Sequence, residues 1–527
     1  MRSVFSPSVH RIIFLGSLVL ALISLPFSKF TLTISIMVFL ANWLIEGEWN
    51  RKWTMLKANY SVFFFSAIFL SLVFGLLYTN NIVYGQKEVV QKLPLLVFPI
   101  VFASSKPLSQ KEKCLLIGSF VTAVFVYTLI SCFLFVYNFN AIDNVRDISP
   151  FVSHIRFSLM VNISIAAVVW AISSIKKLRT GHRFLGFMLI LWFVLYLFVL
   201  KSLTGIVLLF VLASLFLIYK TLKFTKPLHR VLLFVAVLLL WTIPAIYLTT
   251  EANRFFQNRQ VVDDVILNDT TVNGNHYRHN LKYLQYENGN LVWINVCKTE
   301  LEKEWNARSE IDYTGKDKLG QPLSSTLIRY LASLGLNKDS VGVWSLTNED
   351  VMHIESGATN VLFKQNRLGL YPRLYQTFWE IDQYRMYNHV SGSSLVQRYV
   401  FVRAGFNILL QNFWIGVGTG DLVDEFNSYY HQNEPKLKRK YWYLSHNQFL
   451  THAVQVGFIG FLLFIAGWFV PIYIKRKSID LLSVAFFIIA TLSMLNEDTF
   501  QTHVGVTLTA TFYGMLIFGT SSNDAHE

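Results

Sequence analysis

The stretch VLLFVAVLLLWTIPAIYL at residues 231–248 decides the fold class, because it contains no charged side chain. About 20 consecutive apolar residues are enough for a helix to cross the hydrocarbon core of a bilayer. The whole chain of 527 residues has a similar character, since 53% of it is hydrophobic, 16% aromatic and only 15% charged. A soluble protein carries a charged fraction nearer about 25%. We therefore predict an all-α polytopic membrane protein, which excludes a soluble globular enzyme, a disordered chain and a fibrous repeat.

Similar apolar runs recur on both sides of this stretch and give about 12 candidate transmembrane helices. They are residues 11–27, 31–45, 60–78, 93–103, 114–137, 157–175, 184–200, 203–219, 231–248, 446–474, 481–495 and 504–519. The fourth is short and contains Pro94 and Pro99, which is typical of a broken or re-entrant segment. No small-residue cleavage site follows the first, so we expect a retained helix rather than a signal peptide.

The loops between these segments differ strongly in positive charge. If the N-terminus is cytoplasmic and every segment crosses, the inner loops carry about 19 Lys and Arg residues and the short outer loops about 6. This asymmetry favours a topology in which both termini are cytoplasmic. The formal net charge of +14 is then a consequence of topology and gives no support to nucleic-acid binding.

A long polar segment at residues 249–445 separates the ninth candidate helix from the tenth. A structureless loop of this length is uncommon, so we predict a small, mainly helical domain on the non-cytoplasmic side. The chain then divides into nine transmembrane helices at residues 1–248, this domain at residues 249–445, and three transmembrane helices at residues 446–527.

Several motifs that carry chemistry are absent from the sequence. It has no phosphate-binding GxxxxGK[ST] loop and no HExxH, CxxC, DxD or GxSxG motif, and its three cysteines lack zinc-ligand spacing. These absences argue against direct ATP drive, metalloprotease or thiol redox activity, and metal-dependent transfer from a nucleotide sugar. We expect no metal and no other cofactor.

Two arginines near the end of the polar segment are the first candidate site residues. Arg403, Asn407 and Gln411 recur every four residues, which predicts a helix with one polar face lying along the outer membrane surface. The planar guanidinium of Arg398 or Arg403 can donate two parallel hydrogen bonds to one phosphate. The alternative is an arginine that extends its charge to the lipid headgroups without a functional role.

A glycine-rich turn follows, with Gly416, Gly418 and Gly420 leading into Asp421, which we expect to cap a helix. Glycines allow successive backbone N–H groups to converge on an anion. A simple tight turn explains the same residues, and both interpretations stay open.

His446 is the most informative residue. We expect Ser445 to cap the tenth transmembrane helix, which places His446 in its first turn, where the positive helix end favours a neutral imidazole that can accept a proton. Gly457 lies eleven residues on, about three turns, and therefore on the same helix face as His446. The alternative is an interfacial or capping histidine.

Further outer-side candidates are Arg156, with His154 beside it, Lys201 in a tight turn, and Glu497 with Asp498 at the end of the eleventh helix. Arg156 and Lys201 can each bind a lipid phosphate or be an interfacial anchor. The carboxylates of Glu497 and Asp498 can be functional or can be solvated in a short loop.

This order of segments resembles the O-antigen ligase family of bacterial inner membranes. The likeness rests on the arginines, the GVGTGD turn, the Ser445-His446-Asn447 step and the His-x10-Gly spacing of His446 and Gly457. The polar segment resembles a version common in the Bacteroidetes branch, notably at residues 274–277, 287–293 and 320–323.

The resemblance implies a metal- and ATP-independent glycosyltransferase of the GT-C type that acts in lipopolysaccharide biosynthesis at the cell inner membrane. Such an enzyme moves an O-antigen glycan from undecaprenyl diphosphate onto lipid A-core at the periplasmic face, among membrane lipids. His446 would be the general base. Arg398, with Arg403, Lys201 and Arg156, would bind the diphosphate, and Gly416, Gly418, Gly420, Asp421, Asn447 and Gly457 would support the site.

Two positions depart from the family's pattern. Val402 stands where the family has an aromatic residue, and Leu203 stands where it often has an arginine, which leaves Lys201 as the candidate replacement. An O-antigen polymerase that uses the same donor is the closest alternative. A transporter or flippase of lipid-linked glycans is a second alternative.

Overall fold

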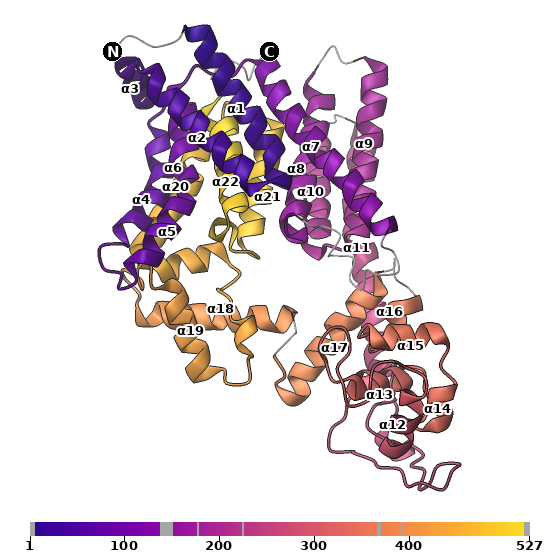
Figure 1. Cartoon of the computed structure of the whole chain (residues 1–527). Helices are drawn as coiled ribbons and strands as arrows, with labels where there is room; N and C mark the ends of the chain where they lie inside the picture. Colours follow the sequence, from indigo (N-terminus) through magenta and orange to yellow (C-terminus); the bar gives the residue numbers. More distant parts are fainter. Residues whose placement is uncertain are drawn as a thin grey trace. The chain divides into compact units, whose positions relative to one another are not determined.

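The computed structural model describes residues 6–137, 151–175, 179–223, 226–365, 370–390 and 394–520 (Figure 1). The chain is 73% helical with only 2% strand, which confirms the predicted all-α character. It divides into two compact units. The first unit comprises Met1–Lys223 and Gln397–Glu527, and the second comprises Phe224–Val396.

The first unit is built from helices that come from both ends of the chain. Before the second unit these are α1 (Pro7–Phe27), α2 (Lys29–Glu46), α3 (Trp49–Ala58), α4 (Ser61–Phe74), α5 (Ile82–Lys92), α6 (Pro94–Ser104), α7 (Gln110–Tyr137), α8 (His154–Ser174), α9 (Thr180–Val199) and α10 (Leu203–Lys223). After it come α18 (Ser394–Gln411), α19 (Leu422–Asn433), η3 (Arg439–Tyr441), α20 (Gln448–Lys475), α21 (Leu481–Met494), η4 (Thr499–Gln501), α22 (His503–Tyr513) and η5 (Gly514–Phe518).

Eight helices of the described residues are long and apolar enough to cross a membrane, and a ninth is added if α3 and α4, bent by 98°, form one span. The eight are α1, α2, α7, α8, α9, α10, α20 and α11 (Pro227–Gln257). Each of the 12 predicted segments overlaps a helix, but α4, α6, α21 and α22 are shorter than a full span, so the predicted count is not confirmed. Both termini, with Arg2, Arg146, Lys176 and Lys177 of the charge count, lie outside the described residues.

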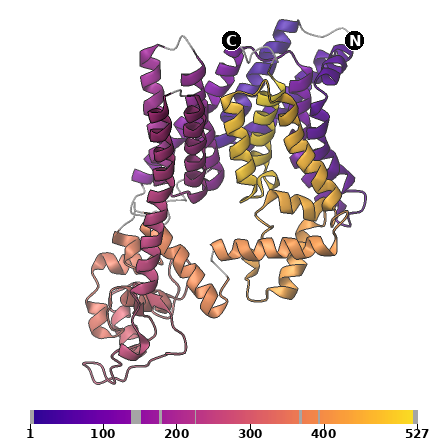
Figure 2. The ribbon, with the colours of Figure 1, turned by 180° about the vertical axis from the view of Figure 1, so that it is seen from behind.

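The helices α20, α21 and α22 pack among the helices that begin the chain (Figures 1 and 2). Helix α20 runs along α4, α22 packs on α6, and α21 packs on α8. Buried aromatic and branched side chains fill the space between these helices, as expected for segments that are apolar on all sides. This arrangement brings the loops before α20 and after α21 next to the ends of α5, α8 and α10.

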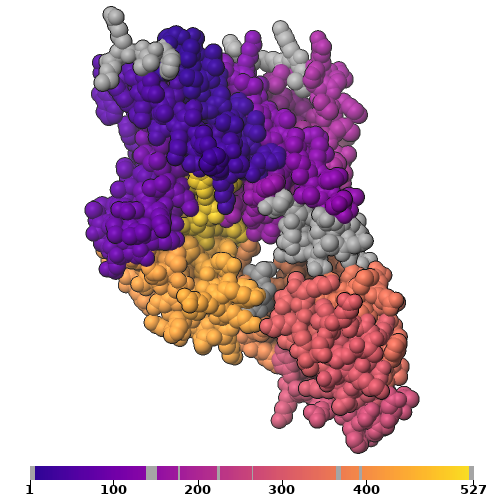
Figure 3. All heavy atoms as spheres, in the orientation of Figure 1, coloured from indigo at the N-terminus to yellow at the C-terminus, as the bar shows by residue number. Residues whose placement is uncertain are grey.

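The second unit begins with α11 and continues with a small domain of short helices, whose atoms form one closely packed surface in Figure 3. Its further elements are η2 (Val262–Asp264), β1 (Tyr286–Glu287), β2 (Asn290–Leu291), α12 (Lys298–Asn306), α13 (Leu323–Ser333), α14 (Ser340–Trp344), α15 (Asn348–Glu355), α16 (Leu362–Gln365) and α17 (Tyr371–Tyr387). Strands β1 and β2 pair antiparallel, and Trp305, Leu327 and Leu331 lie in the core.

The bounds of this unit differ from the predicted domain at residues 249–445. Helix α11 continues past residue 248 to Gln257 and packs against α17, so it joins the second unit. Residues 397–445 pack with the first unit instead. The arginine and glycine motifs therefore belong to the same unit as His446.

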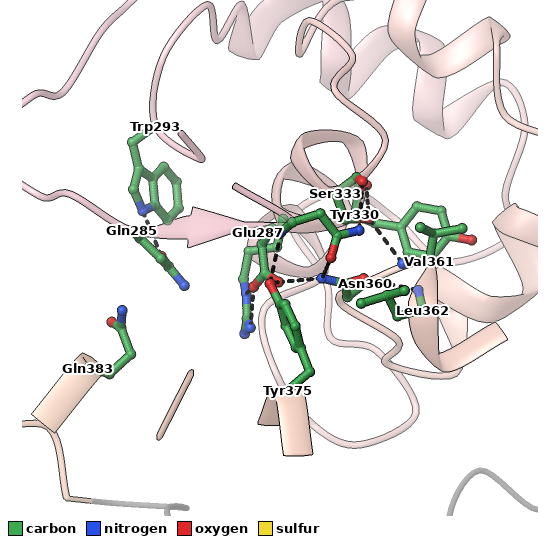
Figure 4. A network of polar contacts seen from close by, with 12 residues as sticks. Gln285, Glu287, Trp293, Tyr330, Ser333, Asn360, Val361, Leu362, Tyr375 and Gln383 are labelled. Atoms are coloured by element: carbon green, nitrogen blue, oxygen red, sulfur yellow. Dashed lines mark hydrogen bonds and ion pairs between the residues drawn. The ribbon is translucent and has the colours of Figure 1, made fainter. Parts of the chain in front are cut away.

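A buried carboxylate ties β1 to α13 and α17 of the second unit (Figure 4). Glu287 is fully buried and accepts hydrogen bonds from Arg329 at 2.6 Å, Asn360 at 2.7 Å and Tyr375 at 3.0 Å. Burial and the adjacent carboxylate raise the pKa of Tyr375, which keeps this phenol a donor. A charge this deeply buried requires such a complete set of partners.

Candidate active site

Arg398 lies on α18, which runs across the direction of α20–α22 (Figures 1 and 2). Its guanidinium donates through Nη2 to Glu497 Oε1 at 2.8 Å and through Nη1 to Asn496 Oδ1 at 3.1 Å. Both acceptors lie in the loop between α21 and α22. Val400 and Phe401, both buried, fix this part of α18, and the side chain of Arg398 stays 34% exposed.

His446 stands just outside α20 rather than in its first turn. Asn447 caps the helix by accepting a hydrogen bond from the Leu450 amide at 3.0 Å, so the prediction of Ser445 as the cap is wrong. The Ser445 hydroxyl instead donates to the Asn447 carbonyl at 2.9 Å. An asparagine competes well with serine for a cap position, and His446 then takes a left-handed conformation with φ 50°. His446 is therefore not in the first turn of α20, and the expectation that was based on that position loses its support.

The imidazole of His446 lies between two aromatic rings and beside a carboxylate. Its centroid is 5.5 Å from that of Phe401 and 5.8 Å from that of Tyr443. Nδ1 is buried, has no hydrogen-bond partner among the described residues, and lies 3.7 Å from Glu497 Oε2. The Glu497 carboxylate therefore lies next to both the imidazole of His446 and the guanidinium of Arg398.

Asp498, next to Glu497, fixes the backbone around His446. It accepts hydrogen bonds from the His446 amide at 2.9 Å and from the Thr451 hydroxyl at 2.5 Å, which joins the α21–α22 loop to the start of α20. Burial raises the pKa of Asp498, although these hydrogen bonds oppose the shift.

Glu497 shows the opposite balance. Burial opposes its ionisation, but neighbouring His446, Arg398 and Arg156 outweigh burial and lower its pKa below the ordinary value. Glu497 is therefore a carboxylate at neutral pH, and Arg156 on α8 belongs to the same cluster.

A pocket between α8, α21 and α22 opens next to this cluster. Apolar side chains line most of it, including Leu159, Ile163 and Leu508. Arg156 and Glu497 form its charged end. The pocket thus combines an apolar interior with a charged end.

The structure places the other predicted phosphate contacts differently. Arg403 is exposed on α18, about 140° around the helix from Arg398, and makes no ion pair within the described residues. Lys201 lies in the turn between α9 and α10 with φ 50°. Thr204, three residues on, accepts a hydrogen bond from Asn496 at 3.0 Å, so this turn adjoins the loop that holds Arg398.

The glycine turn joins parts of the first unit. The five backbone amides of residues 416–420 donate to the carbonyls of Asn412, Val454, Gln455 and Gly75 and to the hydroxyl of Thr79. No amide of the turn remains to bind an anion, which favours the tight-turn interpretation of Gly416, Gly418 and Gly420. Asp421 stands at the N-cap position of α19, but its carboxylate accepts from the amides of Asn80 and Asn81, each at 2.7 Å, so the capping prediction is wrong.

Gly457 does not share a helix face with His446, because α20 breaks at this residue, where φ is 71° and ψ is −173°. A β-carbon here would lie 2.4 Å from the backbone of Trp414. Only glycine allows the 414–416 backbone to approach so closely. The prediction of a shared face is therefore wrong, and the glycine acts through packing with the glycine turn.

Sequence reasoning missed Asn496, Thr451 and a second buried ion pair near the site. Lys92 and Glu88 on α5 form that pair, and Lys92 also donates to Gln501 at 3.0 Å and interacts with Asp498. Three consecutive polar residues, Asn496-Glu497-Asp498, after an apolar run were the available signal for the loop.

The O-antigen ligase family model matches residues 361–465 of the chain. The chain carries a domain of the O-antigen ligase family. The matched stretch contains Arg398, Arg403, the glycine turn, His446 and Gly457. This family covers O-antigen ligases and polymerase-like enzymes, which are glycosyltransferase-like, so the match supports an enzyme role. The match and the apolar helices together imply a membrane protein with several spans. The family in general implies a lipid-linked glycan donor and a lipid A-core acceptor. No curated protein matches the chain.

Proposed function

We propose that this protein is a metal- and ATP-independent ligase that moves a glycan from undecaprenyl diphosphate to a hydroxyl of lipid A-core at the periplasmic face of the bacterial inner membrane. One observation carries the proposal: the imidazole of His446 and the guanidinium of Arg398 lie beside one carboxylate, Glu497. A proton acceptor and a phosphate-binding cation are the two groups that this transfer needs.

In the proposed step, Nε2 of His446 takes the proton of the acceptor hydroxyl. The hydroxyl oxygen forms a bond to the anomeric carbon of the glycan as the bond from that carbon to the diphosphate oxygen breaks, and the electron pair leaves with undecaprenyl diphosphate. Glu497 holds Nδ1 on the opposite side of the ring and stabilises the imidazolium that forms. The present 3.7 Å separation shortens as substrate closes the site, as is common for catalytic hydrogen bonds.

Arg398 stabilises the charge that develops on the departing diphosphate. Glu497 and Asn496 accept one N–H each, and the side chain is 34% exposed, so further N–H groups of Arg398 remain for a phosphate. Arg156 meets the second phosphate from the charged end of the pocket, with the donor lipid among the apolar side chains there. Lys201 and Arg403 are further proposed contacts, and Asp498 positions His446 through its backbone.

The test is reconstitution of the purified protein with carrier-linked glycan and rough lipopolysaccharide, with chelator present and nucleotide absent. We expect a covalent glycan–acceptor product. His446→Ala should lower the transfer rate by about 10²- to 10⁴-fold, the usual contribution of a positioned base, without loss of membrane insertion. His353→Ala is the matched control, because His353 in the second unit also lies 3.7 Å from a glutamate, Glu349. Normal transfer by His446→Ala would contradict the assigned base.

The matched family also covers polymerase-like enzymes, so an O-antigen polymerase is the second candidate. Lipopolysaccharide from a deletion strain separates the two. Loss of all attached polymer indicates a ligase, whereas retention of a single attached repeat indicates a polymerase. Movement of the glycan across the membrane without bond formation in the reconstituted system would instead support a flippase.

A further inference from the structure

A short basic loop, EPKLKRKYWY at residues 434–443, leads directly into the candidate active site. It carries four cations in five positions, and all four side chains are exposed: Lys436, Lys438, Arg439 and Lys440. The loop lies between α19 and Ser445, within the first unit. The proposed mechanism uses none of these residues.

The basic loop is an ordered turn. Leu437 is buried, and its carbonyl accepts a hydrogen bond from Trp442 Nε1 at 3.0 Å. The Tyr441 amide bonds to the Lys438 carbonyl at 2.9 Å, and the Tyr443 carbonyl accepts from Tyr430 at 2.8 Å. These contacts fix the backbone of the loop with Leu437 inside, and the four cations are exposed on it.

The charge of this loop conflicts with the topology signal of the rest of the chain. In the proposed orientation, the short outer loops together carry only about 6 Lys and Arg residues, because positive charge next to a span is disfavoured on that side. Four cations within twelve residues of the start of α20 oppose the same rule. A cluster of positive charge on the side where such charge is disfavoured indicates a partner that carries clustered negative charge.

The basic loop is continuous with the site. The Tyr443 ring ends the loop, is 52% exposed and lies 5.8 Å from the imidazole of His446. A molecule held by the cations can therefore place a sugar on the exposed face of Tyr443, next to the proposed base.

We propose that the basic loop is the docking surface for the acceptor, and that it binds phosphate groups carried by the acceptor's own glycan. This rests on the proposed function. The donor diphosphate is assigned to Arg398 and Arg156, which are partly or largely buried, whereas four exposed cations on one turn match several phosphates displayed on a lipid-anchored sugar. Tyr443 sets the position of the acceptor sugar by stacking.

The experiment measures transfer to rough lipopolysaccharide and to its chemically dephosphorylated form, in nanodiscs of zwitterionic lipid. The loop variant combines Lys436→Gln, Lys438→Gln, Arg439→Gln and Lys440→Gln. The matched control neutralises four exposed lysines of the second unit: Lys282→Gln, Lys298→Gln, Lys303→Gln and Lys316→Gln. Donor KM and acceptor KM are determined separately, each at saturating co-substrate.

The loop variant should raise the KM for the phosphorylated acceptor about ten-fold or more, the combined effect of several exposed charge pairs, with unchanged donor KM and kcat. The wild-type protein should show a similar rise with the dephosphorylated acceptor, and the loop variant no further rise. The control variant should match the wild type. Added salt should reduce the difference between wild type and loop variant.

Two results would overturn the inference while leaving the proposed function intact. One is wild-type kinetics in the loop variant. The other is a loss that depends on anionic phospholipid in the nanodisc and not on acceptor phosphates, which would mean that the loop binds the membrane surface. Absence of any glycan–acceptor product with the wild-type protein would instead contradict the proposed function.

Discussion

Two buried glutamates, Glu287 in the second unit and Glu497 in the first, show how a structural network differs from a candidate active site. Glu287 is 0% exposed, and Arg329, Asn360 and Tyr375 all donate to it. Glu497 also faces an arginine, but that arginine is 34% exposed, and the nearby Nδ1 of His446 is buried without a hydrogen-bond partner among the described residues. Buried polar groups normally have their partners. The unpartnered Nδ1 of His446 therefore leaves room for its contact with Glu497 to shorten when substrate binds, as the proposed step requires.

The largest expected effect on stability lies in the complete network. Arg329→Met leaves the Glu287 carboxylate buried without its counter-charge and removes the stacking of the guanidinium on Trp379 at 4.4 Å. We expect the free energy of unfolding of the second unit to fall by about 3–5 kcal/mol, measured by denaturant unfolding of the detergent-solubilised protein. A change below about 1 kcal/mol, the size found for surface ion pairs, would show that the two networks do not differ in this way.

The corresponding change in the first unit should act on activity. Arg398→Lys keeps the charge but loses the planar donor pair, so transfer should fall about 10²-fold with little change in thermal stability. Arg11→Lys is the control, since Arg11 makes a comparable pair with Glu112 in the same unit at 2.7 Å. Normal turnover of Arg398→Lys would remove Arg398 from the proposed site.

A smaller effect is expected where the glycine turn meets α20. Gly457→Ala places a β-carbon 2.4 Å from the Trp414 backbone at a residue with φ 71°, which should cost about 1–3 kcal/mol of stability. Gly118→Ala on α7 meets nothing within 4 Å and should be neutral or stabilising. Melting temperatures of the two variants test whether the turn is structural, and an unchanged value for Gly457→Ala would contradict the close approach.

Apolar runs in the sequence predicted 12 helical segments, and each of these overlaps a helix in the structure. Residue chemistry proposed Arg398 and His446 as site residues, and their roles stay predictions. Local signals failed at the helix start, where Ser445 and Asn447 both favour the cap position and only the folded backbone selects one. They failed again at Gly457, because a positive φ follows from a packing contact with residues about 40 positions away and not from the local sequence.

The link between His446 and the carboxylates joins residues 52 positions apart. Sequence named Glu497 and Asp498 only as outer-side candidates, since no periodicity connects a loop after one helix to the start of another. Helix packing of α20 against α4 and of α21 against α8 creates that neighbourhood. Contacts of this kind depend on tertiary structure, which a single sequence does not specify by pattern alone.

The smallest expected effect concerns the charge of Glu497. Its pKa is lowered, so it is a carboxylate across the neutral range, and it lies next to both His446 and Arg398. Glu497→Gln keeps the size of the side chain but removes this charge, so kcat should fall at neutral pH because the imidazolium formed in the proposed step loses its stabilising partner. Acid protonates the wild-type carboxylate, so the difference in kcat between wild type and variant should shrink as the pH falls through the lowered pKa of Glu497.

Glu349→Gln, which removes the glutamate 3.7 Å from His353 in the second unit, should match the wild type at every pH. A rate difference between wild type and Glu497→Gln that stays constant down to acid pH would mean that the charge of Glu497 plays no part and that its role is structural. Wild-type kcat in Glu497→Gln would contradict the proposed stabilisation of the imidazolium.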